Sequence, residues 1–280
     1  MIPASCRPLT CRPLSDLPPA ALARVAGVLT DIDDTLTRDG AIEPVALSAL
    51  QALADAGLPV FAITGRPLGW SEPFARTWPL QAIVAENGAV GVWREGAQLH
   101  TEFVQDAATR AHNTRRLQAV AARVLAEVPG ATLARDSAGR VTDIAIDHSE
   151  FVQLPPAAIA QVVALMQAEG MHATVSSTHI NGWFGAHDKW SGACWIVQRR
   201  LGRDLAAETD RWLYVGDSTN DQVMFGRFAL SVGVANLRHF AAQLHTWPAF
   251  ITDGERGAGF AELVAHLLAA RASATRVSGA

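Results

Sequence analysis

The 280-residue sequence is almost without lysine: only one of its 23 basic residues is a lysine, Lys189, and the other 22 are arginines. A compositional bias toward arginine explains why lysine is scarce, but it does not explain why one lysine remains. Charged residues make up 18% of the chain and hydrophobic residues 49%. This balance excludes a disordered chain, and the length suggests about two domains.

Several other features are missing, and each excludes a class of protein. The net charge of −4 excludes a protein that binds a nucleic-acid backbone, which would need a basic face. No apolar run approaches the length of a membrane span. The three cysteines are too few and too scattered for a disulfide framework or a zinc site, so we expect a reducing cytoplasm. The sequence leaves both a monomer and a homodimer open.

The first 22 residues hold no apolar run of signal-peptide length. We predict that residues 1–22 form a flexible arm outside the fold. From residue 25, short apolar runs at 26–32, 58–63 and 82–85 alternate with stretches of helical spacing at 44–56 and 68–78. Buried strands separated by helices predict an α/β fold with a doubly wound, Rossmann-like parallel sheet.

The middle of the chain changes character, with half-exposed strands expected at 88–93 and 141–147 and helices at 111–128 and 156–169. The alternating pattern resumes with a helix at 191–201, followed by strands at 212–215, 230–234 and 250–252 and a last helix at 259–270. We therefore predict a core domain formed by residues 23–87 and 187–273, interrupted by an inserted α+β domain at 88–186.

Polar clusters follow the expected core strands, at the edge where open α/β sheets bind ligands. Asp31, Asp33 and Asp34 end an otherwise apolar strand, which is costly unless a cation or a shared proton neutralises them. The alternative is an acidic turn that caps a helix. Thr64-Gly65-Arg66 follows the next strand and could bind an anion, although Thr-Gly is also an ordinary turn.

Two more clusters complete the set. Lys189 begins a helix, where a lysine opposes the helix dipole and is usually solvated unless an acidic site lies nearby. The segment Gly216–Asp221 places Asp217 and Asp221 four residues apart, and it could also be a helix N-cap. Ligands that are all oxygens imply a hard cation, and a site with few carboxylates, completed by phosphate and water, suits Mg²⁺. We find no Walker loop, no G-x-G-x-x-G motif and no serine nucleophile elbow.

The order Asp-x-Asp-x-Thr, Thr, Lys and Gly-Asp-x-x-x-Asp resembles the haloacid dehalogenase-like superfamily of phosphohydrolases. Glu86-Asn87-Gly88-Ala89 and the long insertion resemble its branch with a large α/β cap. That branch includes Cof-like, sucrose-phosphate, trehalose-phosphate and mannosyl-3-phosphoglycerate phosphatases. The lysine is commonly followed by glycine in this branch and here by Trp190, which weakens any transfer of substrate identity.

The resemblance implies that Asp31 is a nucleophile that forms an aspartyl-phosphate and that Asp33 is the general acid and base. It also implies Mg²⁺ between Asp31, the backbone carbonyl of Asp33 and Asp217, with Asp221 reached directly or through water. Thr64 and Lys189 would then hold the phosphoryl oxygens. The remaining substrate-binding candidates are Gly65, Arg66, Asn87 and Asn220.

The insertion is expected to select the substrate. His179, Asn181 and Trp183 alternate along one strand and could grip a sugar, although packing inside the cap explains them equally well. Trp70, near Arg66, could lie at the mouth of the site or pack against its own helix layer.

We expect a Mg²⁺-dependent phosphatase acting on a small phosphorylated metabolite, with a sugar phosphate favoured. A phosphotransferase or sugar phosphomutase on the same scaffold is the alternative. A non-catalytic binding protein is disfavoured because no motif position is missing.

Overall fold

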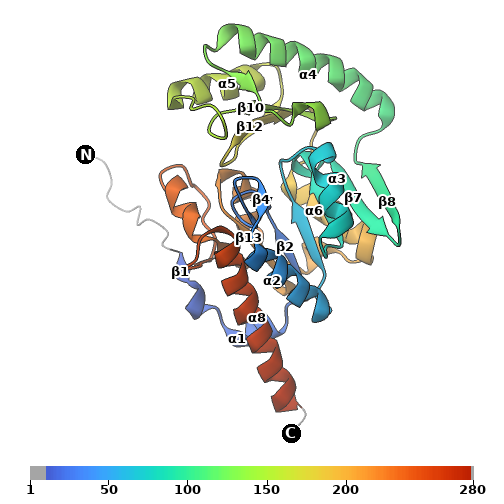
Figure 1. Ribbon diagram of the computed structural model, residues 1–280, viewed down its shortest axis with the longest axis vertical. Coiled ribbons are helices and arrows are strands. Elements are labelled where there is room, and N and C mark those ends of the chain that lie inside the picture. Colours follow the sequence, from blue (N-terminus) through green and yellow to red (C-terminus); the bar gives the residue numbers. More distant parts are fainter. Residues whose placement is uncertain (1–10, 279–280) are drawn as a thin grey trace, which may run out of the picture.

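The computed structural model describes residues 11–278 and shows a large sheet with a smaller layer above it (Figure 1). Nine strands form the large sheet: β1 (Arg12–Pro13), β2 (Gly27–Thr30), β5 (Val60–Ile63), β6 (Ala82–Ala85), β7 (Val90–Glu95), β8 (Gln98–Phe103), β13 (Trp212–Gly216), β14 (Leu230–Gly233) and β15 (Phe250–Ile251). Their order is β1-β15-β14-β13-β2-β5-β6-β7-β8. All neighbours from β1 to β6 are parallel, whereas β7 and β8 are antiparallel. The predicted doubly wound α/β core is confirmed.

Helices cover both faces of this sheet. One face packs against α1 (Pro19–Ala23), α2 (Pro44–Asp55), α3 (Leu68–Thr77) and α8 (Arg256–Ser278), and the other against α6 (Lys189–Leu201) and α7 (Gln222–Phe225). Successive residues of a strand point to opposite faces, so Leu213 and Val215 join the first layer while Trp212 and Tyr214 join the second. The strands are therefore buried on both sides, and β2, β5, β6 and β14 have no exposed residue. This explains their continuous apolar runs.

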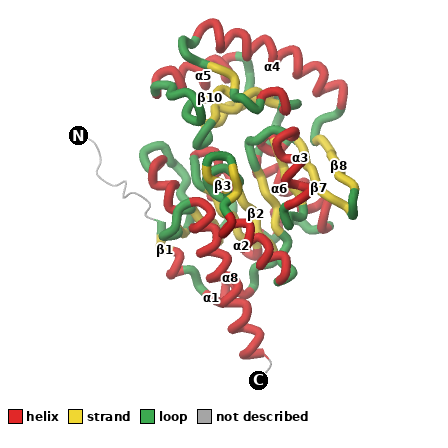
Figure 2. Tube along the Cα trace, viewed as in Figure 1, coloured by secondary structure: helices red, strands yellow, loops and turns green. Residues whose placement is uncertain are grey.

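A second layer lies over the carboxyl ends of the strands, and we call it the cap (Figure 2). Its antiparallel sheet has the order β11 (His172–Val175), β12 (His179–Trp183), β10 (Asp143–Asp147) and β9 (Thr132–Leu133), and α4 (Ala107–Glu127) and α5 (Pro156–Ala168) pack against it. A short hairpin of β3 (Thr37–Arg38) and β4 (Ala41–Ile42) follows the first acidic cluster.

The sheet pairing corrects the expected start of the insertion. β7 pairs with β6, and β8 pairs with β7, so both strands extend the large sheet and an inserted domain that begins at residue 88 is wrong. Val90 and Val92 are fully buried in the core layer beneath α3, which a half-exposed cap strand would not be. We propose that the insertion runs from α4 to β12.

The expectation of a flexible arm over residues 1–22 is wrong for its second half. β1 pairs with β15, and Leu14, Leu17 and Leu22 are at most 3% exposed in the core. Burial of these three leucines outweighs the polar and proline-rich surroundings that suggested disorder. Residues 1–10 lie outside the described part of the chain. Helix α8 also continues past the expected end at residue 270 to Ser278. No helix within residues 11–278 is both long and apolar enough to cross a membrane.

Candidate active site

Three adjacent strands bring the predicted residues together. In the order β13-β2-β5, strand β2 is central, so Asp31 lies between Asp217, which follows β13, and Thr64, which follows β5. The Asp31 amide donates to the Val215 carbonyl at 2.9 Å, which continues the ladder up to the site. The carboxyl-edge rule thus accounts for the meeting of segments almost 200 residues apart in sequence.

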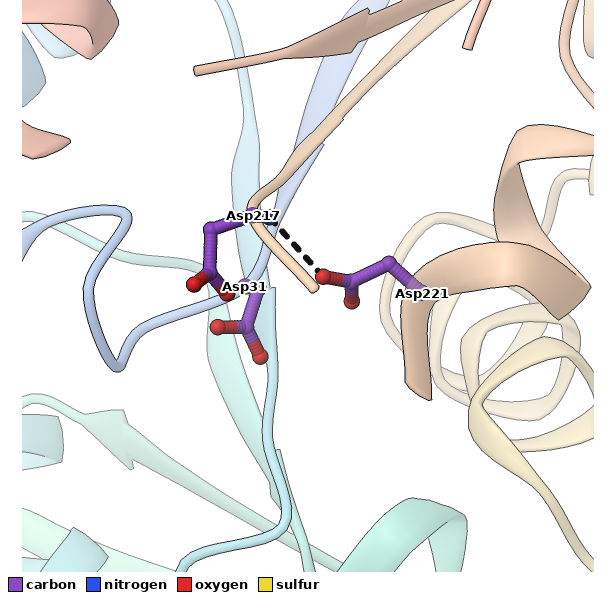
Figure 3. A group of neighbouring side chains, drawn as sticks. All are labelled: Asp31, Asp217 and Asp221. Carbon is purple, nitrogen blue, oxygen red and sulfur yellow. Dashed lines mark hydrogen bonds between the residues drawn. The ribbon is translucent and has the colours of Figure 1, made fainter. Parts of the chain in front are cut away.

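A cluster of buried carboxylates lies at this edge (Figure 3). Asp31, Asp217 and Asp221 each offer an oxygen within 4.8 Å of the others, and none is more than 3% exposed. Lys189 is the cation that contacts them: its Nζ donates to Asp31 Oδ1 at 2.6 Å and to Asp221 Oδ1 at 2.7 Å. Three carboxylates and one ammonium leave two negative charges unbalanced, which is the charge of one divalent cation.

The pKa values reflect this imbalance. Burial raises the pKa of Asp31 to about 8 even though Lys189 lies beside it. Burial also raises the pKa of Asp217 well above its usual range, with further contributions from Asp221 and Asp31. Burial by itself lowers the pKa of Lys189, but Asp221 and Asp31 more than offset this and hold it above its ordinary value. The ammonium therefore stays charged, whereas the carboxylates need a further positive charge to stay ionised together.

Asp221 differs from the other two carboxylates because the protein already saturates it. Its Oδ1 accepts from Lys189 and from the Tyr214 hydroxyl, and its Oδ2 accepts from the amides of Asp217 and Ser218 at 2.9 and 3.1 Å. A carboxylate offers about four lone-pair sites, so none is left for a metal ion. Asp221 is thus placed to hold Lys189. A metal ion in this cluster would be bound by other ligands, and Asp221 would not contact it directly.

Asp33 is not part of this cluster and is bound by an arginine instead. Its two oxygens accept from Nε of Arg66 at 2.9 and 3.0 Å. The same guanidinium contacts two cap carboxylates, Asp136 at 3.2 Å and Glu150 at 2.9 Å. Burial by itself lowers the pKa of Arg66, but the carboxylates of Asp33 and Glu150 raise it by more. The pKa therefore lies above its ordinary value, and Arg66 stays charged. In this arrangement Arg66 binds three carboxylates of the protein itself rather than an external anion.

Asp34, the third acid of the first motif, pairs with a different arginine. Asp34 adopts a left-handed backbone conformation with φ of 53° and pairs with Nε of Arg256 at 2.8 Å. Asn236 donates to the Asp34 carbonyl at 3.0 Å and to Asp217 Oδ2 at 3.3 Å. Sequence reasoning missed Asn236, although it follows β14 at the same sheet edge and the rule that found the other clusters also applies to it.

The second motif forms a tight corner beneath the cap. Thr64 is fully buried, and its hydroxyl accepts from the Arg66 amide at 3.0 Å. A Cβ at Gly65 would approach the side-chain oxygens of Asn87 and Asn181 to 3.3 Å, so glycine allows the cap to sit this close. Asn87 is 1% exposed, and its side-chain nitrogen Nδ2 has no hydrogen-bond partner among the described residues. Asn220 also lies in the site, 3.3 Å from Nζ of Lys189.

The three candidate residues of the cap do not act together. Nε2 of His179 donates to Glu150 at 2.8 Å, and Asn181 donates to Asp143 at 3.0 Å and to the Gly65 carbonyl at 3.3 Å. Both line a small cavity beside Asp31. Trp183 instead donates to the His187 carbonyl at 2.9 Å and lines a different cavity. Trp70 packs in the core layer against Phe74, with the Arg66 guanidinium 5.3 Å from its ring.

Sequence reasoning also missed a set of buried hydrogen bonds that joins cap and core. Glu86 accepts from the backbone amides of Val141 and Thr142 in the cap. Arg140 donates to the Gly65 carbonyl at 2.9 Å while pairing with Asp143 at 2.9 Å. Glu86 and Gly65 lie in segments that the sequence marked, but no local pattern marks their partners in the cap, which are distant along the chain.

Two cavities show how much room the site offers. The cavity that touches Asp31, His179 and Asn181 measures about 10 Å³, which is roughly the space of one water molecule. A larger cleft of about 370 Å³ adjoins it at Asp33, Arg66 and Asp217 and opens between cap and core. A ligand bigger than water therefore reaches Asp31 through the cleft, with some opening of the cap.

Comparisons with known proteins agree with this geometry. Residues 28–124 match the family model of haloacid dehalogenase-like hydrolases. No curated protein sequence is detectably similar to the chain. A protein from Thermoplasma acidophilum has a similar structure, with a TM-score of 0.68, 16% identity and coverage of 87% of this chain and 98% of that one.

Two sugar phosphatases have similar structures as well. The sucrose-phosphatase from Synechocystis, solved with sucrose and phosphate, gives a TM-score of 0.62 at 17% identity and covers 87% of this chain and 98% of its own. The C-terminal domain of trehalose-6-phosphate phosphatase from C. albicans gives 0.64 at 13% identity and covers 94% and 99%. The predicted resemblance to haloacid dehalogenase-like hydrolases is confirmed over residues 28–124, and these solved structures share the fold.

Proposed function

We propose that the protein is a Mg²⁺-dependent phosphatase that hydrolyses the phosphomonoester of a small metabolite through an aspartyl-phosphate at Asp31. The observation that carries this proposal is the buried set of Asp31, Asp217 and Lys189 at the carboxyl edge of the sheet. The hydrolase family match and the phosphatases that share the fold support it.

The donor set fits magnesium. The available ligands are oxygens only, as a hard cation prefers, and the cluster lacks two positive charges. Asp31, Asp217 and the backbone carbonyl of Asp33 would hold the ion, with Asp221 acting from outside the ligand set. When bound, Mg²⁺ would neutralise negative charge on the phosphoryl group.

The chemistry then falls to the side chains. A carboxylate oxygen of Asp31 attacks phosphorus while the bond from phosphorus to the ester oxygen breaks, and the leaving oxygen takes a proton from Asp33. In the second step Asp33 removes a proton from water, which attacks phosphorus and releases phosphate and free Asp31. Lys189 and Thr64 hold the phosphoryl oxygens, so the protein contributes mainly positioning and charge.

Asp33 must leave Arg66 to carry out this role. Both of its oxygens are held by the guanidinium in the closed arrangement. Because Arg66 is tied to the cap through Asp136 and Glu150, movement of the cap would carry Arg66 away and free Asp33. Cap opening and preparation of the general acid are therefore one event in this mechanism.

We propose a sugar phosphate as the substrate. The cleft of about 370 Å³ is lined mostly by polar side chains, including Thr37, Ser177, Thr178 and His239, which suit a hydroxyl-rich leaving group. The substrate would place its phosphate at Asp31 and its sugar in this cleft.

A panel of phosphorylated metabolites, assayed for phosphate release, tests the function. We expect turnover of sugar phosphates that needs Mg²⁺ and is abolished in Asp31→Asn. The matched control is Asp55→Asn, because Asp55 is exposed on α2, and it should keep full activity. Full activity in excess chelator would refute the metal assignment. Transfer of the phosphate to a second sugar without release would instead favour a phosphotransferase.

A further inference from the structure

A second charged cavity is lined by residues on and beside α1 and α8. Figure 1 shows these two helices at the end of the core opposite the cap. It measures about 510 Å³, and all of its charged lining residues are arginines: Arg24, Arg203, Arg211 and Arg271. The remaining lining residues are uncharged, and no carboxylate among residues 11–278 lines this cavity. Its position, at the amino ends of β2 and β13, separates it from Asp31 and Asp217 by the length of the strands.

The four arginines come from separate parts of the fold. Arg24 follows α1, Arg203 follows α6, Arg211 precedes β13, and Arg271 lies on α8. They are therefore gathered by tertiary structure and do not form a local run of basic residues. Like charges brought together in this way repel one another, and an anion between them removes the repulsion.

The carboxylates nearby balance only part of this charge. Arg24 pairs with Asp210 at 2.9 Å, and Glu208 is shared between Arg203 and Arg211. Arg271 donates to the Val25 carbonyl at 2.8 Å, a contact that orients the guanidinium but carries no charge. Four guanidinium groups and two carboxylates leave two positive charges, which equals the charge of a phosphate dianion.

We propose that this cavity binds a phosphate group, carried either by inorganic phosphate or by a phosphorylated metabolite, at a site separate from the reaction centre. Guanidinium groups match phosphate oxygens with two parallel hydrogen bonds each. Gly57, with φ of 69° and no heavy atom within 4 Å of its Cβ position, leaves one wall open to the incoming group.

Calorimetric titration with pyrophosphate in metal-depleted buffer tests the site. Without Mg²⁺ the reaction centre offers the probe only the ammonium of Lys189, which Asp31 and Asp221 already bind, so the arginine cavity is observed alone. We expect saturable binding of one pyrophosphate per chain, retained in Lys189→Gln. Arg203→Gln and Arg271→Gln should each weaken it about tenfold or more, because charged hydrogen bonds are lost.

Arg94→Gln and Arg115→Gln are the matched controls, since both side chains are exposed and neither lines the cavity. They should leave binding unchanged. Modification of Arg203 and Arg271 by phenylglyoxal gives a second readout on the unaltered protein. Inorganic phosphate or a sugar phosphate should protect these residues, and the degree of protection compares the two sources of the phosphate group. Absence of saturable binding, or equal weakening by the control variants, would overturn the proposal. Loss in Lys189→Gln alone would assign the binding to the reaction centre and also overturn it.

Discussion

Replacement of Lys189 by methionine removes the only ammonium from the buried carboxylate cluster while keeping most of the side-chain volume. Lys189 is 2% exposed and contacts Asp31 and Asp221 at 2.6 and 2.7 Å. Removing one partner of a buried ion pair typically costs about 3–5 kcal/mol, because the other charge is left uncompensated. We expect Lys189→Met to lose about that much free energy of unfolding at pH 8 in excess chelator.

The loss should depend on pH and on metal. Burial raises the pKa of Asp31 and Asp217, so in the folded variant these groups can bind protons that the unfolded chain has already released. A folded state that binds more protons loses stability as pH rises, and the penalty should therefore be smaller at pH 6 than at pH 8. Mg²⁺ supplies positive charge to the same cluster and should restore part of the stability at pH 8.

Urea unfolding followed by tryptophan fluorescence measures these differences, and Lys189→Arg is the matched control. Arginine keeps the positive charge, so it should destabilise less than methionine. Its forked guanidinium is too large for the roughly 10 Å³ of free space beside Asp31, so turnover should still be lost. A Lys189→Met protein as stable as the wild type in chelator at pH 8 would refute the charge imbalance. Unchanged turnover of Lys189→Arg would make the single lysine a coincidence.

Three further predictions follow from individual contacts. Tyr214→Phe keeps the ring packing but removes the hydroxyl donor to Asp221, and it should lower the free energy of unfolding by about 1.5–3 kcal/mol in urea titrations. Mg²⁺ affinity measured by calorimetry should rise by up to about 50-fold from pH 6 to pH 8, because a pKa of about 8 leaves Asp31 mostly protonated at pH 6; a flat profile would contradict this. The hydrogen bond from His179 lowers the pKa of Glu150 to about 2. The wild type should thus have a higher free energy of unfolding than Glu150→Gln. This difference should be constant above about pH 5 and vanish as pH falls toward 2.

The core of the fold could be predicted because its strands are buried on both faces and therefore read as continuous apolar runs. The span expected for β6 matches the structure, and α2 differs by one residue at its end. The strand pairing was less accessible. Whether residues 90–95 join the large sheet or the cap depends on which edge they meet, and an apolar run does not specify its neighbour.

The candidate site was predictable where its residues follow strands, as Asp31, Thr64 and Asp217 do, because topology brings those ends together. It was not predictable where a contact depends on the cap. Arg66 was expected to face a substrate anion, yet Asp136 and Glu150 lie against it from segments with no motif. The role of Tyr214 was likewise hidden, because a tyrosine inside a buried strand has the same pattern as any apolar core residue.

Trapping of the phosphorylated enzyme with hydroxylamine, followed by peptide mass spectrometry, tests the covalent chemistry most directly. Protein mixed with Mg²⁺ and a sugar phosphate that it hydrolyses should yield a hydroxamate at Asp31, on the peptide that contains residues 31–34. Asp31→Asn should yield none. A hydroxamate on another residue, or none during steady turnover by the wild type, would contradict Asp31 as the nucleophile.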